Sequence, residues 1–180
     1  MRETNLAANH LWKAAPGCRI VVLDGGAVRF DLPREWVIHL RASHVLMVDA
    51  PSPRTTCRVG VSWHRIPMEA TWMPLSSLLE QGALTETRTV VRNGGLNRIM
   101  RPPLELVWMQ LRVVEGEDGR EGITRMCLAR GGCTQAVILC EFSPENEERL
   151  FPLWQTLLAT LAVGDYIADA ATGARLERRG

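Results

Sequence analysis

The chain has 180 residues, 46% of them hydrophobic and 23% charged, which is typical of one globular domain and excludes intrinsic disorder. Its 21 basic and 20 acidic residues leave a net charge of +1. Because so small a net charge gives little long-range attraction to polyanions, nucleic-acid binding is not expected.

Membrane insertion and export are not expected either. The longest apolar run, Ala136 to Cys140, is far shorter than the roughly 20 residues that cross a bilayer. The segment from Met1 to His10 lacks the apolar stretch of a secretory signal. The odd number and irregular spacing of the cysteines do not match a disulfide framework. We therefore expect a cytoplasmic protein that is a monomer or a small homo-oligomer.

The first half of the chain predicts short strands. An N-terminal arm, residues 1–17, precedes the predicted domain, residues 18–167. The domain opens with two strands, 19–23 and 27–32, joined by Asp24-Gly25-Gly26, because Asp and Gly tolerate the positive φ of a tight hairpin turn. A short segment at 36–40 and a loop at 47–53 follow. Alternation of Val59, Val61 and Trp63 with polar residues then predicts a half-buried strand at 57–66.

A short helix is predicted next. It covers residues 74–81, with Pro74 suited to the first turn and Gly82 to the C-terminal stop. A brief strand at 88–92 and a turn at Asn93-Gly94-Gly95 lead into the centre of the domain.

The second half predicts an antiparallel meander and a closing helix. Strands at 104–114, 122–129 and 133–142 are joined by short loops. The stretch from Ala136 to Phe142 is apolar on both faces except at Glu141 and should be central, with cover on both sides. The helix begins at Ser143-Pro144 and ends at Gly164, and Pro152, which lacks an amide hydrogen, either starts its main part or kinks it. A polar tail, residues 168–180, is expected to fray.

Two parts of the chain resemble a known superfamily. The stretch Phe30-Asp31-Leu32-Pro33-Arg34-Glu35-Trp36 is similar to the F-x-L-P-x-x-W opening of PsbP-like proteins. The strand ending at Phe142 and the helix carrying Trp154, Leu157 and Leu161 resemble the close of that superfamily. The resemblance implies an α+β fold, an antiparallel sheet of about six to seven strands sandwiched between helices in an α/β/α arrangement.

The PsbP-like superfamily includes a photosystem II extrinsic subunit, a Ran-binding nuclear-import factor and bacterial DcrB-like domains, some of which are chaperones for type VI secretion effectors. The resemblance implies binding of other proteins without catalysis, and it supplies no catalytic residue to transfer.

Metal ligands and catalytic residues are not expected. His39 and His44 are five residues apart, which places them on opposite faces of a strand and on no shared helical ridge. Cys127 and Cys133 flank a glycine turn, but a zinc site needs a second pair of ligands. No nucleophile elbow or phosphate-binding glycine loop is present. We therefore expect no metal, no cofactor and no catalysis.

Tryptophan and arginine are the candidate binding residues. Trp36, Trp63 and Trp154 lie in phase with apolar neighbours and are expected in the core. Trp108 shares a strand face with Arg112 and could be partly exposed there, as could Trp72 beside the first helix; the alternative is that helices cover both tryptophans. Arg88 and Arg92 are expected to share one strand face, either as part of a basic patch for an acidic partner or as solvated side chains balanced by nearby glutamates.

These residues favour a non-catalytic protein-binding domain, such as a bacterial chaperone or adaptor. Its expected partner contacts are made by Trp108, Arg112, Arg88, Arg92 and Trp72. The alternative is a small-molecule-binding protein or an enzyme with its site in a cleft between sheet and helix. A deep polar pocket with converging His or Cys would favour that alternative, whereas a broad apolar groove would favour the protein partner.

Overall fold

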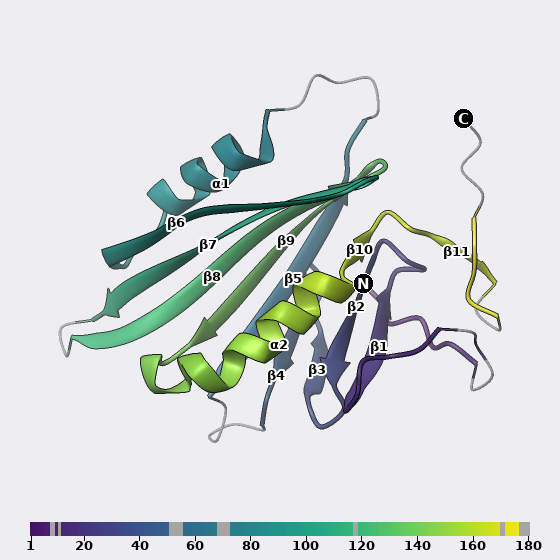
Figure 1. Cartoon of the computed structure of the whole chain (residues 1–180), viewed down its shortest axis with the longest axis horizontal. Helices are drawn as coiled ribbons and strands as arrows, with labels where there is room; N and C mark the ends of the chain where they lie inside the picture. Colours follow the sequence, from purple (N-terminus) through teal and green to yellow (C-terminus); the bar gives the residue numbers. More distant parts are fainter. Residues whose placement is uncertain are drawn as a thin grey trace.

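The computed structural model describes residues 1–7, 10, 12–50, 56–67, 73–116, 119–169 and 172–176. A broad twisted sheet carries helix α1 (Leu75–Leu84) on one face and helix α2 (Glu147–Thr160) on the other (Figure 1). The predicted antiparallel sheet sandwiched between helices is therefore confirmed. Among the described residues, no helix has the length and apolar character that crossing a bilayer requires.

The main sheet has seven antiparallel strands in the order β3-β4-β5-β9-β8-β7-β6. In chain order the strands are β3 (Val37–Leu40), β4 (Val45–Val48), β5 (Cys57–Arg65), β6 (Thr89–Arg101), β7 (Leu104–Glu115), β8 (Arg120–Gly131) and β9 (Thr134–Phe142). Strands β6 to β9 form a meander of consecutive hairpins, as the short loops predict. Strand β9 then pairs with β5, so the strand that is apolar on both faces is central, as expected.

A second, smaller sheet lies against α2. Strands β1 (Cys18–Leu23) and β2 (Val28–Pro33) form the predicted hairpin, and β10 (Ala162–Val163) pairs with β2. Helix α2 therefore ends earlier than predicted, at Thr160, because the residues after it join a sheet edge. In Figure 1 this small sheet stands beside the C-terminal end of α2.

The described part of the C-terminal tail is paired rather than frayed. Strands β11 (Ile167–Asp169) and β12 (Ala174–Arg175) form a two-stranded ribbon. Gly173 lies so close to the Trp12 ring that an added Cβ would be 3.0 Å from it. The N-terminal arm thus supplies a packing surface for the tail, a long-range contact that the local polarity of the tail does not reveal.

Each face of the main sheet has its own apolar cluster. On one face, Leu75 and Leu79 of α1 pack with Val107, Met109 and Leu111 of β7. The opposite face shares one cluster with α2 and the small sheet, which includes Phe30, Leu106, Ile123, Trp154 and Leu157. Alternation along β7 therefore assigns odd-numbered residues to the α1 face and even-numbered residues to the α2 face.

Strands replace part of one predicted loop and the whole of one predicted turn. Val45–Val48 forms β4, so the predicted loop at 47–53 starts later than expected, and residues 51–53 lie outside the described part of the chain. The predicted turn at Asn93-Gly94-Gly95 lies within β6. Strand β7 pairs with β6 from one end of β6 to the other. Two bulges, between Val90 and Arg92 and between Asn93 and Leu96, contain the β6 residues that have no register partner on β7.

A buried arginine holds the first turn of α2 on the sheet. The Arg125 side chain is only 2% exposed and lies among the rings of Phe142, Phe151 and Trp154. Its Nε donates to Gln110 Oε1 at 2.8 Å, and Gln110 Nε2 donates to Glu147 Oε1 at 2.7 Å. Burial lowers the pKa of Arg125, since the low-dielectric interior disfavours its charge.

The charge on Arg125 is compensated mainly by one carboxylate. Glu147 Oε1 is 4.0 Å from Arg125 Nη2, while Nη1 is buried without a hydrogen-bonding partner among the described residues. Removing one member of such an arrangement leaves a buried charge without compensation, whereas removing both charges does not.

We therefore predict that Glu147→Gln lowers the free energy of unfolding by about 1–2 kcal/mol, because the guanidinium loses its counter-charge. Combining it with Arg125→Met should recover most of that loss. Urea unfolding of the two single variants and the double variant measures this. A double variant that loses the sum of both single losses would contradict the assignment.

A second ionic contact fastens the chain before β6 to the α1 face. Glu86 accepts hydrogen bonds from Arg88 Nε at 2.8 Å and Nη2 at 2.7 Å. Arg88 also contacts Thr124 of β8 at 2.9 Å and Glu141 of β9 at 3.0 Å. The hydrogen bond from the Arg88 side chain is the main cause that lowers the pKa of Glu86 to about 2.

Because the pKa of Glu86 is lower in the folded chain than in the unfolded chain, its carboxylate stabilises the fold above about pH 4.5. This stabilisation should disappear as the pH falls toward 2. We predict that Glu86→Gln is destabilised at pH 7 but approaches the wild type near pH 2.5. Urea unfolding at both pH values checks this, with the exposed Glu80→Gln on α1 as control; equal losses at both pH values would contradict it.

Candidate functional site

Two adjoining hollows separate α2 from the β6–β7 hairpin, and we call them together the α2 groove. The hollow at the first turns of α2 has a volume of about 810 Å³ and the one nearer its end about 550 Å³. Trp108 and Phe151 line both. The other lining residues are Gln110, Arg125, Pro144, Glu145, Glu147 and Glu148 in the first hollow and Ile99, Arg101, Trp154, Gln155, Leu158 and Ala159 in the second.

Trp108 forms the floor of the α2 groove and Phe151 its rim. Trp108 is half-buried and packs edge-on against Trp154, with ring centroids 5.8 Å apart. The sequence left open whether Trp108 is partly exposed or covered by a helix; it is partly exposed, and α2 covers one side of its ring. Phe151 is 46% exposed, and no sequence signal separated it from the buried leucines of the same helix.

Arg101 defines the far end of the groove by capping α2. Its guanidinium, at the end of β6, donates to the backbone carbonyls of Leu158, Ala159 and Leu161. Carbonyls in the last turn of a helix lack partners within the helix and carry partial negative charge, so a cation there is favourable. The groove therefore runs between a helix start rich in glutamate and a helix end held by an arginine.

Glutamates give the other end of the groove its charge. Glu145, Glu147 and Glu148 line the hollow at the start of α2. A hydrogen bond from Ser143 Oγ lowers the pKa of Glu145, and Glu147 Oε2 lies 3.5 Å from Arg112 Nη2. Carboxylates are favourable near the first turn of a helix, so these residues stabilise α2 as well as charge the groove.

The predicted arginines divide between the two faces of the sheet. Arg112 lies on the α2 face, 3.3 Å from Glu121, and Arg92 is its register partner on β6. Arg88 instead contacts Thr124 and Glu141 on the α1 face. The expectation that Arg88 and Arg92 share a face is therefore wrong, because the bulge between Val90 and Arg92 reverses the alternation.

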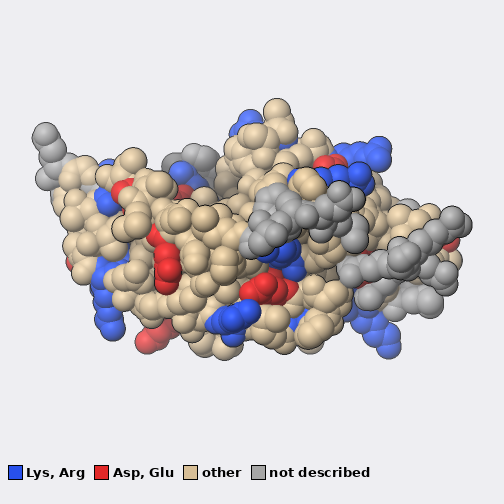
Figure 2. All heavy atoms as spheres, turned by 90° about the horizontal axis from the view of Figure 1, so that it is seen from above, with Lys and Arg blue, Asp and Glu red and all other residues tan. Residues whose placement is uncertain are grey.

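Trp108, Arg112 and Arg92 thus share the α2 face, and Arg88 does not. Trp72 lies outside the described residues. Figure 2 views the molecule from above, from the side on which α1 lies in Figure 1, and there basic and acidic side chains are interspersed with wide neutral areas between them.

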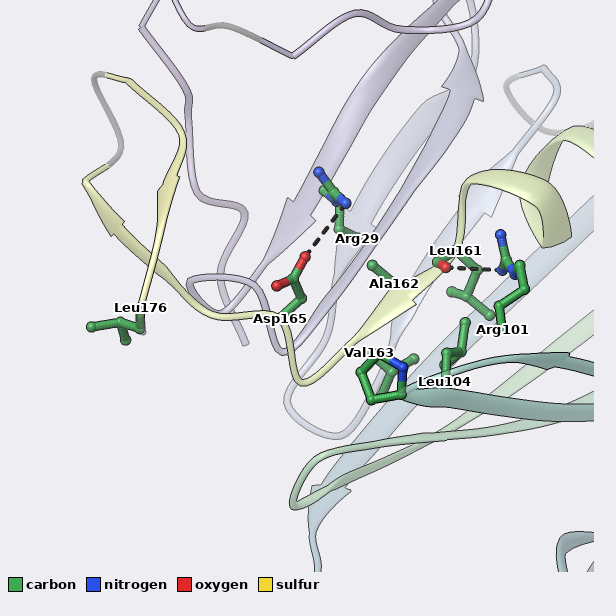
Figure 3. A pocket seen from close by; sticks show the side chains of 9 residues that line it. Arg29, Arg101, Leu104, Leu161, Ala162, Val163, Asp165 and Leu176 are labelled. Carbon is green, nitrogen blue, oxygen red and sulfur yellow. Dashed lines mark hydrogen bonds and ion pairs between the residues drawn. The ribbon is translucent and has the colours of Figure 1, made fainter. Parts of the chain in front are cut away.

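A third hollow, of about 390 Å³, continues past Arg101 (Figure 3). Arg29 lies 3.5 Å from Asp165 across it, and the guanidinium of Arg29 stacks on Trp12 at 4.1 Å. Leu104 and Leu161 to Val163 supply its apolar wall. Its residues come from four separate segments, so no local pattern in the sequence could have indicated it.

Four of the five cysteines are buried packing residues, and Cys133 is half-buried. Cys57 and Cys140 bring their Sγ atoms to 3.7 Å on adjacent strands, whereas Cys127 is buried without such a contact to Cys133. The hydrogen bond with Cys140 and burial raise the pKa of Cys57, and burial raises that of Cys127. Both thiols therefore stay protonated and are poor nucleophiles. Within the described ranges, no three His, Cys, Asp or Glu residues converge as a metal site would require.

Solved structures show the same fold. The cyanobacterial PsbP protein CyanoP from Synechocystis sp. PCC 6803 superposes with a TM-score of 0.58 at 10% identity, over 85% of this chain and 98% of that one. The Ran-binding protein Mog1p from Saccharomyces cerevisiae gives 0.57 at 12% identity, over 81% and 95%. The protein PA94 from Pseudomonas aeruginosa, a putative regulator, gives 0.53 at 13%, over 81% and 96%. These likenesses confirm the PsbP-like fold.

Sequence comparison identifies a closer relationship. An uncharacterised protein, alr1449, from Nostoc sp. (strain PCC 7120) is 31% identical over 176 residues, which span 96% of this chain and 92% of the relative. The Alr1449 family model matches residues 19–167, nearly the whole of the predicted domain. The chain therefore belongs to the Alr1449 family.

Proposed function

We propose that this chain is a non-catalytic protein-binding domain that holds a segment of a partner protein in the α2 groove. The observation that carries the proposal is the pair of aromatic side chains, Trp108 and Phe151, that line both hollows of an open groove. Exposed aromatic rings beside a preformed hollow are typical anchors at protein interfaces, because burying them releases water from a large apolar area.

The dimensions of the groove support an extended segment. Helix α2 has 14 residues, so the groove beside it is about 21 Å long. A stretch of about six residues in extended conformation spans that length. Apolar side chains would occupy the middle of the groove, between the glutamates at one end and Arg101 at the other.

The PsbP-like fold supports the same role by analogy. Mog1p, which shares the fold, is a Ran-binding protein. On this basis we propose that the chain acts as a chaperone or adaptor in the bacterial cytoplasm. Trp108, Arg112 and Arg92, which share the α2 face, are the predicted residues that can contribute to one contact surface.

Phe151 is the position that tests the groove most cleanly. Its ring is 46% exposed and is one of three that surround Arg125, so Phe151→Ser should lower the free energy of unfolding by no more than about 1 kcal/mol. We predict that affinity capture from cells of the source organism retains one stoichiometric partner on the wild-type chain and loses it on Phe151→Ser. Quantitative mass spectrometry of the retained proteins measures the change.

The matched control is Leu84→Ser, which replaces an 85% exposed apolar side chain on α1, at the opposite face of the sheet. It should retain the partner. Equal retention by Phe151→Ser, or the absence of any retained protein together with a small molecule that co-purifies in native mass spectrometry, would contradict the proposal and favour a ligand-binding protein.

Trp108→Ala should behave differently from Phe151→Ser. Because Trp108 also packs on Trp154, we predict a loss of about 2 kcal/mol in the free energy of unfolding in addition to the loss of the partner. Thermal unfolding measures the first effect. A fully stable Trp108→Ala that keeps its partner would exclude the floor of the groove as a contact surface.

A further inference from the structure

Strand β6 leaves a long open edge on the main sheet. It extends from Thr89 to Arg101 and lies last in the strand order, so its outer backbone groups face no other strand among the residues that the structure describes. Nearly every residue along it is exposed. Unpaired amide and carbonyl groups in a row are a template for pairing with a further strand.

Only the second part of this edge is regular enough to accept a strand. Two bulges interrupt the pairing of β6 with β7 before Leu96, whereas the register from Leu96 to Arg101 is continuous. A bulge bends a strand and breaks the repeat of its hydrogen-bonding groups. The stretch from Leu96 to Arg101, which we call the β6 edge, is therefore the part that can pair with an extended chain.

The side chains of the β6 edge alternate in a simple pattern. Leu96, Arg98 and Met100 lie opposite Met109, Val107 and Glu105 of β7, on the α1 face. Leu96 is 40% exposed and Met100 53%, because α1 packs over β7 and β8 and leaves them uncovered. Between them, the Arg98 side chain is 60% exposed and pairs with Glu105 at 2.9 Å. Two apolar side chains with a cationic one between them therefore lie beside the unpaired backbone groups of β6.

Charge argues against a second copy of the chain at this edge. Strand β6 contains Arg92, Arg98 and Arg101 and no acidic residue. Of these, Arg98 lies in the α1-face row, so two such edges paired about Arg98 would set the Arg98 side chains of both copies side by side. Like charges that face each other across a strand pair are destabilising. A strand with a carboxylate beside Arg98 would instead form an ion pair with the Arg98 guanidinium.

We propose that the β6 edge binds an extended segment of a partner protein in which an acidic residue lies between two apolar residues at alternate positions. Its backbone continues the sheet beyond β6. Its two apolar side chains cover Leu96 and Met100, and its carboxylate pairs with Arg98. Because the pattern is symmetric about the acidic residue, the pairing is possible in either chain direction. The α1-face side chains that it uses do not line the α2 groove, although Ile99 and Arg101 of the same stretch do, and binding at the edge does not require the groove to be occupied.

The test uses two short capped synthetic peptides that differ at one position. The acidic peptide has the core Val-Thr-Glu-Thr-Val, and in the basic peptide Lys replaces Glu. We expect the acidic peptide to shift backbone amide resonances of the isotope-labelled protein within β6. The basic peptide should bind at least about tenfold more weakly, and Arg98→Glu should reverse the preference by favouring the basic peptide. A variant with a damaged fold would bind neither peptide, so a reversed preference shows that residue 98 pairs directly with the charged residue of the peptide.

Two control variants locate the effect. Arg58→Glu changes an exposed arginine on β5, far from the edge in strand order, and should leave both affinities unchanged. Phe151→Ser changes the α2 groove and should also leave peptide binding unchanged, so failure at the edge is distinguished from failure of the proposed function. Equal binding of both peptides, no binding of either, or resonance shifts confined to the groove would overturn the proposal. So would a dimer of the free chain whose β6 amides are protected from hydrogen exchange.

Discussion

Helix α2 packs between two sheets, and contacts at both of its ends set its position on the larger one. At the first turn, Glu147 accepts a hydrogen bond from Gln110 and faces the buried guanidinium of Arg125. At the last turn, Arg101 donates to three backbone carbonyls. Because strands β6, β7 and β8 supply these contacts, the helix is held against both sliding and rotation. The width of the α2 groove follows from this placement.

Arg125 shows why polar contacts rather than apolar packing determine that placement. Leucines on α2 could pack on the sheet at several neighbouring positions, since dispersion and hydrophobic contacts are not directional. A buried guanidinium is different, because it requires its acceptors at particular positions and a misplaced helix would leave it without compensation. We infer that Arg125 contributes to the specificity of the packing more than to its strength.

The β6–β7 hairpin borders both proposed binding surfaces. One face of β7 supplies Trp108 to the α2 groove, while the outer side of β6 presents the open edge. The bulges in β6 separate these roles, because they turn Arg92 toward the α2 face and leave Leu96, Arg98 and Met100 in regular alternation on the other. A segment bound at the edge and one bound in the groove would therefore lie on the same hairpin without competing for the same side chains.

Local patterns in the sequence determined the elements of this fold. Alternation placed Val59, Val61 and Leu106 in strands, helical spacing placed Trp154 and Leu157 on a buried face, and the apolar stretch from Ala136 to Phe142 identified the central strand. Such patterns report which residues are buried, because burial repeats with the period of the element. They also located Trp108 and Arg112 on one face.

Only the tertiary structure decided that Asn93 to Gly95 continues a strand, that Arg88 and Arg92 face opposite ways, and that Phe151 and Arg101 complete a groove. These outcomes depend on pairing with β7 and on the position of α2, which are contacts between distant residues that no local pattern encodes.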